Sequence, residues 1–420
     1  MPETRSLSKS IRLREGIFMY VGSVLGSGIL VSPAIAANIA GPASLVAWIT
    51  LSLLSYPIAY TFAALASTYP DAGGISTYVK RAFGWRIGTI AGWLFVFSFF
   101  VGAPIVSIVS ASYIITSLGL PSGLLYPLAF VFMTGTILIN LTGIKIGSRA
   151  EFVILGTVVV ALSIAVALTL PHIRPNNFVP FAPKGWYPIG VVAAVIFFSF
   201  LGYENVPHMA EEFRNPKRDF KLSIGISVLI TSVLYVLISL ATIGTAIYKN
   251  QTLYAPVALM FSNSLGVSSE IIVLFLAVTL CFGALNAYSI GVSRLVFALA
   301  RDNSMPSLLQ QLNSRAAPAR AIVTLFFGAA IGLAIDALIR VRLDDLFLVS
   351  GAGFISLYIL GSASAVKLLK LNGLKRIFPY LTLVVSIAAF AFVGKYALFP
   401  VSICFLAIVW AERFRLSVVR

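Results

Sequence analysis

Residues 22–29, Gly-Ser-Val-Leu-Gly-Ser-Gly-Ile, lie in the middle of the first long apolar run, residues 16–40. A run of this length predicts one membrane-spanning helix. Three glycines in seven residues disfavour a continuous helix, because each costs about 1 kcal/mol relative to alanine. Lipid cannot satisfy the backbone groups that a break would free, so a break must face protein or a hydrated cavity. We therefore predict that the backbone opens here around a small charged ligand.

The two sides of this break would free different backbone groups. A half-helix that begins near Ser27 or Gly28 would present N–H groups and a positive dipole end, which suit a carboxylate. Carbonyls freed near Ser23 and Val24 suit an ammonium group. Donors and acceptors arranged in this way match an α-amino acid. Close packing of helices through small residues explains the same glycines equally well.

Glu204 is the one acidic residue at the middle of a predicted span. It lies in a second interruption, which reads Ser-Phe-Leu-Gly-Tyr-Glu-Asn over residues 199–205. A charge at this depth costs about 2.5–3.5 kcal/mol on insertion scales, so such residues are functional by default. Three roles fit its chemistry: proton carrier, ligand of an amine or another cation, and hydrogen-bonded strut that holds the broken helix. As a strut it would be a neutral acid bonded to freed backbone.

The composition is that of a polytopic membrane protein. Of 420 residues, 59% are hydrophobic and only 10% are charged, and the mean hydropathy is +0.98. A soluble domain carries about 25% charged residues. The net charge of +16 does not indicate a nucleic-acid partner, because the lysines and arginines fall in short loops between apolar runs. Cys281 and Cys404 lie inside apolar runs and predict neither a disulfide nor a metal site.

Apolar runs of about 20 residues predict twelve spans and therefore an all-α polytopic fold. They cover residues 16–40, 43–68, 86–117, 123–142, 151–170, 188–209, 221–248, 269–297, 320–339, 344–366, 377–394 and 396–412. With a cytoplasmic N-terminus, 24 of the 30 Lys and Arg residues fall in inner segments and 6 fall in outer segments. This bias follows the positive-inside rule and predicts that both chain ends are cytoplasmic.

The first and sixth spans are both interrupted at mid-depth, and they lie one five-helix unit apart. Paired broken helices at corresponding positions of two halves indicate the binding site of a secondary transporter. Because five is odd, the second half must be inverted in the membrane. We predict a five-plus-five inverted repeat with two further helices: a first repeat over residues 1–170, a second over 171–368, and helices eleven and twelve over 369–420.

Two inner loops have distinctive sequences. The first, residues 69–84, contains Pro70, Gly73, Gly74, Tyr78, Phe83 and Gly84. The second, residues 212–220, reads Glu-Phe-Arg-Asn-Pro-Lys-Arg-Asp-Phe. Each combines a glycine or proline turn with a short, amphipathic, basic segment at the membrane surface. The sequence contains no paired acids, Ser–His arrangement, metal-ligand cluster or phosphate-binding glycine loop, so it predicts no catalytic site, no metal and no cofactor.

With these residues in view, the chain resembles the amino acid–polyamine–organocation superfamily of secondary transporters over nearly its whole length. Four motifs carry the resemblance. They are Gly-Ser-Gly-Ile at 26–29, the Pro-x-x-Gly-Gly loop from Pro70, Phe-x-Gly-x-Glu at 200–204 with the Glu-x-x-Asn-Pro-x-Arg loop after it, and Ser293-Arg294 through Ala300-Arg301-Asp302 to Pro306. Within the superfamily, the chain is most similar to bacterial exporters of L-methionine and branched-chain amino acids. The narrower likeness rests on residues 281–286 and on total length.

The resemblance implies how the substrate backbone is held. Backbone and hydroxyl donors of Gly26, Ser27 and Gly28 would bind the carboxylate. The ammonium group would meet carbonyls near Val24 and along residues 198–201.

Two rings and three further side chains would decide which amino acid is bound. Phe198 matches the aromatic residue that caps the substrate in arginine–agmatine exchangers of the superfamily, and Tyr288 matches a second ring on the eighth helix. Val96, Phe100 and Leu201 would complete the pocket. None of these residues is charged, so a neutral, apolar side chain is favoured. The full predicted binding set is Val24, Gly26, Ser27, Gly28, Ile29, Val96, Phe100, Phe198, Phe200, Leu201, Gly202 and Tyr288.

The coupling ion is the point at which the chain departs from some relatives. Certain proton-coupled members carry a lysine on the fifth helix, where Val158 stands here, and residues 152–170 contain no lysine. The hydroxyls of Ser289 and Ser293, with carbonyls of the first helix, would suit sodium. Proton coupling through Glu204 and uncoupled exchange are the other mechanisms that the sequence leaves open.

We therefore predict a secondary active transporter, and not an enzyme, that moves neutral apolar L-amino acids of the methionine, leucine, isoleucine and valine class by alternating access. Its partners would be the amino acid and the lipid bilayer of the plasma (cell inner) membrane, with no nucleic acid and no indicated oligomeric state. An exchanger of cationic amino acids or polyamines, with Glu204 as the cation ligand, is the alternative within transport. A transport-inactive membrane sensor or interaction subunit is the alternative from another class.

Overall fold

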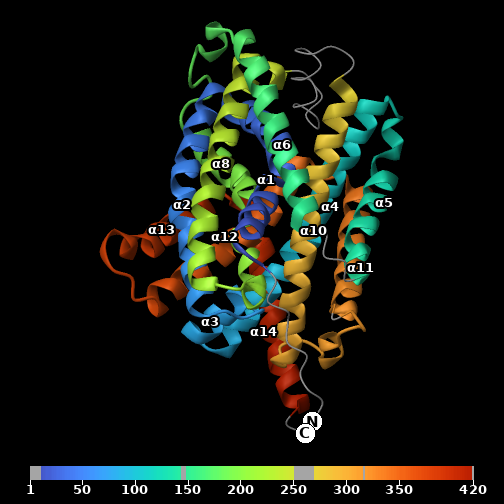
Figure 1. Ribbon diagram of the computed structural model, residues 1–420, viewed down its shortest axis with the longest axis vertical. Helices are drawn as coiled ribbons and strands as arrows, with labels where there is room; N and C mark the ends of the chain where they lie inside the picture. The colour runs from blue at the N-terminus through green and yellow to red at the C-terminus, as the bar shows by residue number, and fades with distance from the viewer. Residues whose placement is uncertain (1–10, 143–147, 250–268, 316, 419–420) are drawn as a thin grey trace.

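The computed structural model describes residues 11–142, 148–249, 269–315 and 317–418 (Figure 1). Within these residues every regular element is an α-helix or a short 3₁₀-helix, and no strand is present. The α-helices are α1 Leu13–Ala40, α2 Ser44–Thr68, α3 Ile75–Phe83, α4 Trp85–Leu118, α5 Leu125–Leu138, α6 Ser148–Thr169, α7 Tyr187–Ile196, α8 Pro216–Gly244, α10 Ser269–Arg301, α11 Ala319–Ile339, α12 Leu343–Leu368, α13 Phe378–Ala391 and α14 Leu398–Val418. Parts of the predicted first repeat, residues 1–10 and 143–147, lie outside the described residues.

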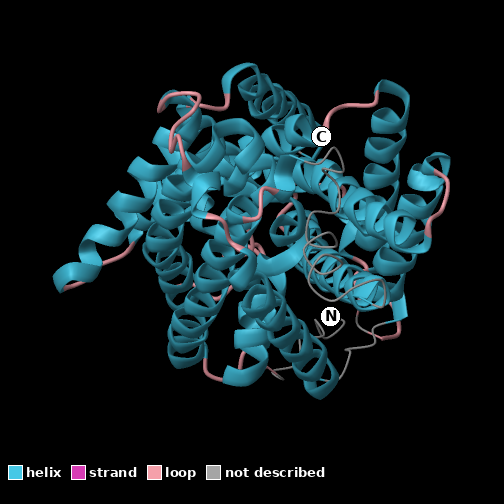
Figure 2. Cartoon of the chain, turned by 90° about the horizontal axis from the view of Figure 1, so that it is seen from above, coloured by secondary structure: helices cyan, strands magenta, loops and turns pink. Residues whose placement is uncertain are grey.

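Helices are the expected outcome for so apolar a chain, because a helix satisfies its own backbone groups where lipid offers no partner. In the described part of the chain, nine segments are long and apolar enough to cross a membrane, and the first of them, Leu13–Thr68, contains both α1 and α2. Two shorter apolar stretches are Tyr187–Phe200 and Gly394–Trp410. Figure 2, a view from above, shows the long helices packed side by side. The prediction of an all-α polytopic membrane protein is confirmed at this level.

α1 contains one residue with non-helical dihedral angles, Gly26, at φ −21° and ψ −146°. This kink lies within residues 22–29, where the sequence predicts an interruption. Every residue from 20 to 37 is buried. The backbone groups freed at the kink therefore face protein and not lipid, as the membrane requires.

The second predicted interruption divides the predicted sixth span, 188–209, into separate pieces. α7 covers Tyr187–Ile196 and passes into a 3₁₀-helix, η6, over Phe197–Phe200. Turns cover residues 201–205, and a second 3₁₀-helix, η7, covers Val206–Glu212. This span is therefore helical only in part, and its irregular middle coincides with the predicted break.

Two glycines let the interrupted segments touch at the centre of the bundle. Gly202 has φ +129°, and a Cβ atom there would lie 2.8 Å from the carbonyl carbon of Ser23 on α1. A Cβ atom on Gly28 would lie 2.8 Å from the Cα atom of Ser199. Only residues without a side chain allow two backbones to approach so closely. α1 also packs along α8 and α10, so the crossing of the two segments lies among other helices (Figure 1).

The first predicted loop motif forms a turn followed by α3. Gly74, with φ +49°, precedes this helix, and Gly84, with φ +92°, ends it. Tyr78 is buried, whereas Phe83 is 37% exposed. The predicted turn and amphipathic segment are therefore both present.

Two other predictions need correction. The basic residues after Asn215 do not form a separate short segment, because Pro216 begins α8 and the helix continues to Gly244. Proline is favoured in the first turn of a helix, where its missing N–H is not needed. The predicted twelfth span, 396–412, is present as α14, but the helix continues beyond the predicted end to Val418.

The contact at Gly202 gives a first testable prediction. Replacing Gly202 with alanine should lower the free energy of unfolding by about 2–4 kcal/mol, because the backbone angle is strained for any side chain and the new Cβ would overlap α1. We expect a lower apparent melting temperature in detergent. Gly225→Ala on α8 is the matched control, since its Cβ would meet nothing within 4 Å. Equal effects of the two substitutions would contradict the role given to the contact.

Candidate functional site

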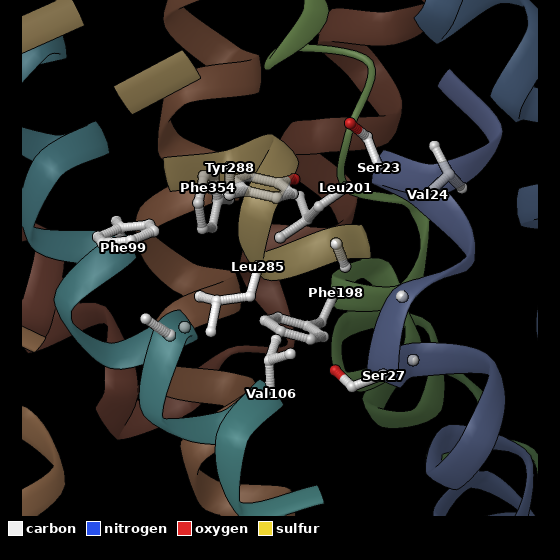
Figure 3. A pocket seen from close by; sticks show the side chains of 15 residues that line it. Ser23, Val24, Ser27, Phe99, Val106, Phe198, Leu201, Leu285, Tyr288 and Phe354 are labelled. Carbon is white, nitrogen blue, oxygen red and sulfur yellow. The ribbon is translucent and has the colours of Figure 1, made fainter. Parts of the chain in front are cut away.

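A cavity of about 50 Å³, partly open to solvent, lies where the two interrupted segments meet three other helices (Figure 3). Its walls come from α1, α4, η6 with the turn after it, α10 and α12. The lining residues are Ser23, Val24, Gly26, Ser27, Gly28, Phe99, Gly102, Ala103, Val106, Phe198, Leu201, Ala284, Leu285, Tyr288 and Phe354.

Two serine hydroxyls of α1 line the cavity without a protein partner. Ser23 is 4% exposed and Ser27 is 2% exposed, and neither Oγ atom has a hydrogen-bond partner within the described residues. Leaving a buried hydroxyl unpaired costs about 1–3 kcal/mol. Figure 3 shows the Ser27 hydroxyl on the Phe198 side of the cavity. These hydroxyls are therefore available to a polar group of a ligand.

The rest of the cavity is mainly apolar. Phe99 and Val106 of α4 and Leu285 of α10 lie across the cavity from α1, with Phe354 of α12 beside them (Figure 3). No charged side chain occurs among the described lining residues. The site therefore suits a ligand with one polar end and an apolar body.

Each of the three glycines within residues 22–28 of α1 lies against a different neighbour. A Cβ atom on Gly22 would lie 3.0 Å from the side chain of Leu155 on α6, and one on Gly26 would lie 2.7 Å from the Cβ atom of Ala284 on α10. Gly28 contacts η6, as described above. Gly26 and Gly28 also line the cavity, whereas Gly22 does not. Small residues therefore allow close packing at all three positions, and two of the three glycines also line the cavity.

Several of the predicted binding residues do meet at this cavity. Phe198, Leu201 and Tyr288 line it together with Val24 and the residues of the α1 kink. Phe198 also packs edge-on against Phe347 of α12, with ring centres 4.5 Å apart. The two rings that the resemblance singled out therefore belong to one site.

Five residues of the predicted binding set lie outside the cavity lining, and their part in binding stays a prediction. They are Ile29, Val96, Phe100, Phe200 and Gly202. Ile29 is fully buried in the hydrophobic core. The Phe200 ring packs on Trp48 and Tyr235, with centres 5.9 and 5.1 Å apart. Gly202 is used for the backbone contact with α1.

Val96 and Phe100 differ from the α4 residues that line the cavity in their position along or around that helix. Phe99, Ala103 and Val106 recur at helical spacing and line the cavity. Val96 lies one turn before them on the same face, beyond the cavity, and is 3% exposed. Phe100 lies on the next face, where its ring contacts a glycine of α11.

Glu204 is buried, but it does not line the cavity. Its Oε2 atom accepts hydrogen bonds from the backbone N–H of Gly202 at 2.8 Å and from the hydroxyl of Tyr358 at 2.5 Å. Its Oε1 atom accepts a hydrogen bond from the Tyr288 hydroxyl at 2.7 Å. The partners come from its own turn, α12 and α10. Among the three predicted roles this geometry agrees with the strut, with the difference that both oxygens accept bonds as a carboxylate does, whereas the predicted strut was a neutral acid.

Tyr235 of α8 is a site residue that the sequence alone did not single out. Its hydroxyl lies 2.7 Å from the carbonyl oxygen of Val24 and 2.6 Å from that of Ser199, and it shares its proton between them. The ring stacks on Trp48, with centres 5.1 Å apart. One side chain therefore bonds a carbonyl of each interrupted segment. The sequence did offer one signal for this role. Tyr235 lies in the middle of a predicted span, where a buried tyrosine hydroxyl needs a hydrogen-bond partner.

The two serines of the predicted sodium site hydrogen-bond within α10. The Ser289 hydroxyl donates to the carbonyl oxygen of Leu285 at 2.6 Å, and the Ser293 hydroxyl donates to that of Ile290 at 2.8 Å. Each oxygen keeps its lone pairs for a cation. Val158 is buried at the position discussed above, and the sodium site stays a prediction.

Comparison with known proteins identifies the family. A family model described as amino acid permease matches residues 13–411. The chain belongs to the amino acid permease family. This amino acid permease is 34% identical over 364 residues to the amino acid permease YecA of Bacillus subtilis, with 86% of each chain covered. It is 32% identical over 377 residues to the L-methionine/branched-chain amino acid exporter YjeH of Escherichia coli, with 87% of each chain covered.

The branched-chain amino acid permease BcaP of Bacillus subtilis is 28% identical over 388 residues, which cover 87% of this amino acid permease and 82% of BcaP. These matches confirm the resemblance to the amino acid–polyamine–organocation superfamily. The relatives are permeases and transporters rather than enzymes. The matched residues include both interrupted segments and the cavity between them.

The bridge formed by Tyr235 leads to a second prediction. Tyr235→Phe should destabilise the permease by about 1–3 kcal/mol, because the carbonyls of Val24 and Ser199 lose their common donor while the ring stays in place. The change should appear as a lower apparent melting temperature. Tyr187→Phe serves as the control, since that side chain is 75% exposed. A loss no larger than that of the control would refute the bridge.

Proposed function

We propose that this permease is a secondary active transporter that moves neutral, apolar L-amino acids of the methionine, leucine, isoleucine and valine class by alternating access. The observation that carries the proposal is the cavity, which combines two unpaired serine hydroxyls beside the α1 kink with an otherwise mainly apolar lining. The names of two relatives, an L-methionine/branched-chain amino acid exporter and a branched-chain amino acid permease, agree with such substrates.

In this proposal the kink of α1 recognises the substrate backbone. Backbone donors of residues 26–28 and the Ser27 hydroxyl bind the carboxylate, because a helix start favours negative charge. The ammonium group binds carbonyls of the two interrupted segments. Tyr235 already bonds the carbonyls of Val24 and Ser199, but each carbonyl oxygen has a second lone pair.

The side chain of the substrate then meets the apolar wall. Phe198 and Tyr288 contact it from two sides, and Phe99, Val106 and Leu285 form the surface opposite α1 (Figure 3). A hydrocarbon or thioether side chain gains from leaving water at about 25 cal/mol per Å² of apolar surface. A charged side chain would find no counter-charge among the described lining residues.

Glu204 is the reason to prefer neutral substrates over cationic amino acids or polyamines. Both of its carboxylate oxygens already accept hydrogen bonds, from Gly202, Tyr288 and Tyr358, and the residue does not line the cavity. Acting as a cation ligand would require that network to break. Glu204 therefore serves as a strut in the proposed mechanism.

Ion coupling would involve Glu204 or the predicted sodium site, and uncoupled exchange is the third mechanism that the sequence leaves open. If Glu204 took up a proton, it would gain a donor, so one of the bonds to Tyr288 and Tyr358 would have to reverse. Such a change links protonation to the position of the turn after η6. Sodium binding at Ser289 and Ser293 is the alternative, and it requires no change at Glu204.

The membrane arrangement belongs to the same proposal. Twelve spans form a five-plus-five inverted repeat, residues 1–170 and 171–368, with two further helices over 369–420. α1, α2, α8 and the α7–η7 segment rock against the other helices, and the packing of α8 along α1 and α2 supports their movement as one unit. Both chain ends face the cytoplasm at the plasma membrane. α3 and the C-terminal end of α14 lie at the same end of the molecule, which is then the cytoplasmic end (Figure 1).

A substrate screen tests the proposed class. In proteoliposomes, labelled methionine and leucine should be taken up or exchanged, and unlabelled isoleucine or valine should compete. Arginine and putrescine should compete only weakly, because the described lining offers no counter-charge. Repeating the assay with and without sodium and across pH separates the coupling mechanisms. Strong competition by arginine or putrescine, or binding without any flux, would overturn the proposal in favour of the alternative exchanger or a sensor.

Ser27 tests the mode of binding. Ser27→Ala should raise KM for methionine roughly tenfold or more, because a hydrogen bond to a charged group contributes about 1.5–3 kcal/mol. Ser27→Phe should abolish transport by filling the cavity. Ser110→Ala on α4 is the matched control, since that hydroxyl is also buried without a partner but does not line the cavity. Unchanged kinetics in both Ser27 variants would refute the assignment.

A further inference from the structure

His208 lies on η7, shortly after Glu204, and is fully buried. Its Nδ1 atom is 3.0 Å from the carbonyl oxygen of Ala72. A carbonyl oxygen only accepts, so Nδ1 carries a proton and donates it. The Nε2 atom is buried and has no partner within the described residues. The one polar contact of this ring therefore ties η7 to the loop of residues 70–74.

Gly74 leaves the space in which the ring lies. A Cβ atom on Gly74 would overlap the Cε1 and Nδ1 atoms of His208, and the glycine has φ +49°. The imidazole also meets the Phe95 ring of α4 edge-on, with centres 5.0 Å apart and planes at 86°. The loop and α4 together form a slot that fits the His208 ring.

The loop that receives His208 is fixed to α3 and α10. One carboxylate oxygen of Asp71 accepts a hydrogen bond from the N–H of Gly73 at 2.7 Å, and the other lies 3.5 Å from the guanidinium of Arg301. Lys80 of α3 lies 2.7 Å from the carboxylate of Asp302. Partly exposed ion pairs of this kind contribute little energy. They nevertheless tie the loop and α3 to the end of α10.

The segment that carries His208 is joined to different helices. The N–H of Arg214 donates to the carbonyl oxygen of Ile11, just before α1, at 2.9 Å. Phe213 stacks on Phe220 of α8, with ring centres 4.3 Å apart. The contact between His208 and the loop therefore crosses from the α1 and α8 side of the molecule to the α3, α4 and α10 side.

We propose that His208 is a positioning residue that latches the α3 end of the transporter shut. Docked in its slot, the ring holds η7 and the first half of α1 against α3, α4 and α10, and its release lets them separate. Asn205 supports the same closure, because its Nδ2 atom donates to the carbonyl oxygen of Ala287 on α10 at 3.0 Å. The role of Gly74 is then to leave room for the His208 ring. The inference rests on the alternating-access mechanism proposed above.

Side-specific labelling of a cysteine measures this opening without a substrate. The reporter is Ser23→Cys, at a buried position of the cavity, in a chain that also carries Cys281→Ala and Cys404→Ser. A membrane-impermeant thiol reagent is applied separately to the two faces of oriented vesicles. Lys370→Cys in the same background, at an exposed position, controls for access of the reagent.

Three variants are compared with the parent reporter. His208→Ala removes the latch, and Gly74→Ala forces the ring out of its slot. Each should raise the labelling rate from the α3 face by roughly threefold to tenfold, the shift that loss of one hydrogen bond produces in a two-state equilibrium. Because both changes break one contact, the double variant should label no faster than His208→Ala alone.

Gly84→Ala is the matched control for backbone strain. Gly84 also has a positive φ at an end of α3, but a Cβ there would meet nothing within 4 Å. This variant should label at the parent rate. An equal increase in Gly84→Ala and Gly74→Ala, additive effects in the double variant, or an unchanged rate in His208→Ala would each overturn the latch. Transport is measured separately in the chain without these substitutions, and labelling as expected together with no amino acid transport by that unsubstituted chain would instead refute the proposed function.

Discussion

Backbone groups that are freed in the middle of a membrane must be bonded by protein, ligand or water, because lipid offers no partner. This permease has two such places, and it brings them together. Tyr235 of α8 bonds one carbonyl from each interruption, and Glu204 bonds the N–H of Gly202. Tyr288 and Tyr358 hold Glu204 from α10 and α12. The arrangement of these helices around the crossing follows from the need to supply these partners.

The protein supplies hydrogen-bond partners for some polar groups around the two interruptions and leaves other polar groups there unpaired. The carbonyls of Val24 and Ser199 have a common donor in Tyr235, whereas the hydroxyls of Ser23 and Ser27 have no partner within the described residues. A site with unpaired donors next to a helix start favours an anionic group. In the proposed mechanism, the polar end of the cavity therefore binds the carboxylate, and the rest of the lining selects the side chain.

The interruptions could be predicted from the sequence because glycine clusters and a mid-span acid conflict with a continuous helix in lipid. Phe198 and Tyr288, which the resemblance singled out, both line the cavity. The face of α4 could not be predicted in the same way. That helix is apolar on all sides, so its pattern does not distinguish Phe99 from Phe100, and only packing decides that Phe100 faces α11. Tyr235 was missed because a single tyrosine in an apolar span is most often a core residue.

The contacts of the second interrupted segment set how stable the closed state of the α3 end is in the proposed mechanism. In the described part of the chain, four hydrogen bonds join residues 204–208 to the facing elements: two at Glu204, one at Asn205 and one at His208. At roughly 1.5–3 kcal/mol for each of the two bonds to the Glu204 carboxylate and 0.5–1.5 kcal/mol for each of the other two, they amount to about 4–9 kcal/mol. A ligand can reverse a two-state equilibrium from 1:99 to 99:1 only with about 5.5 kcal/mol of differential affinity. In the proposed mechanism, closure by several bonds of this size keeps the free-energy difference between the closed and open states comparable to the differential affinity that a bound amino acid can supply.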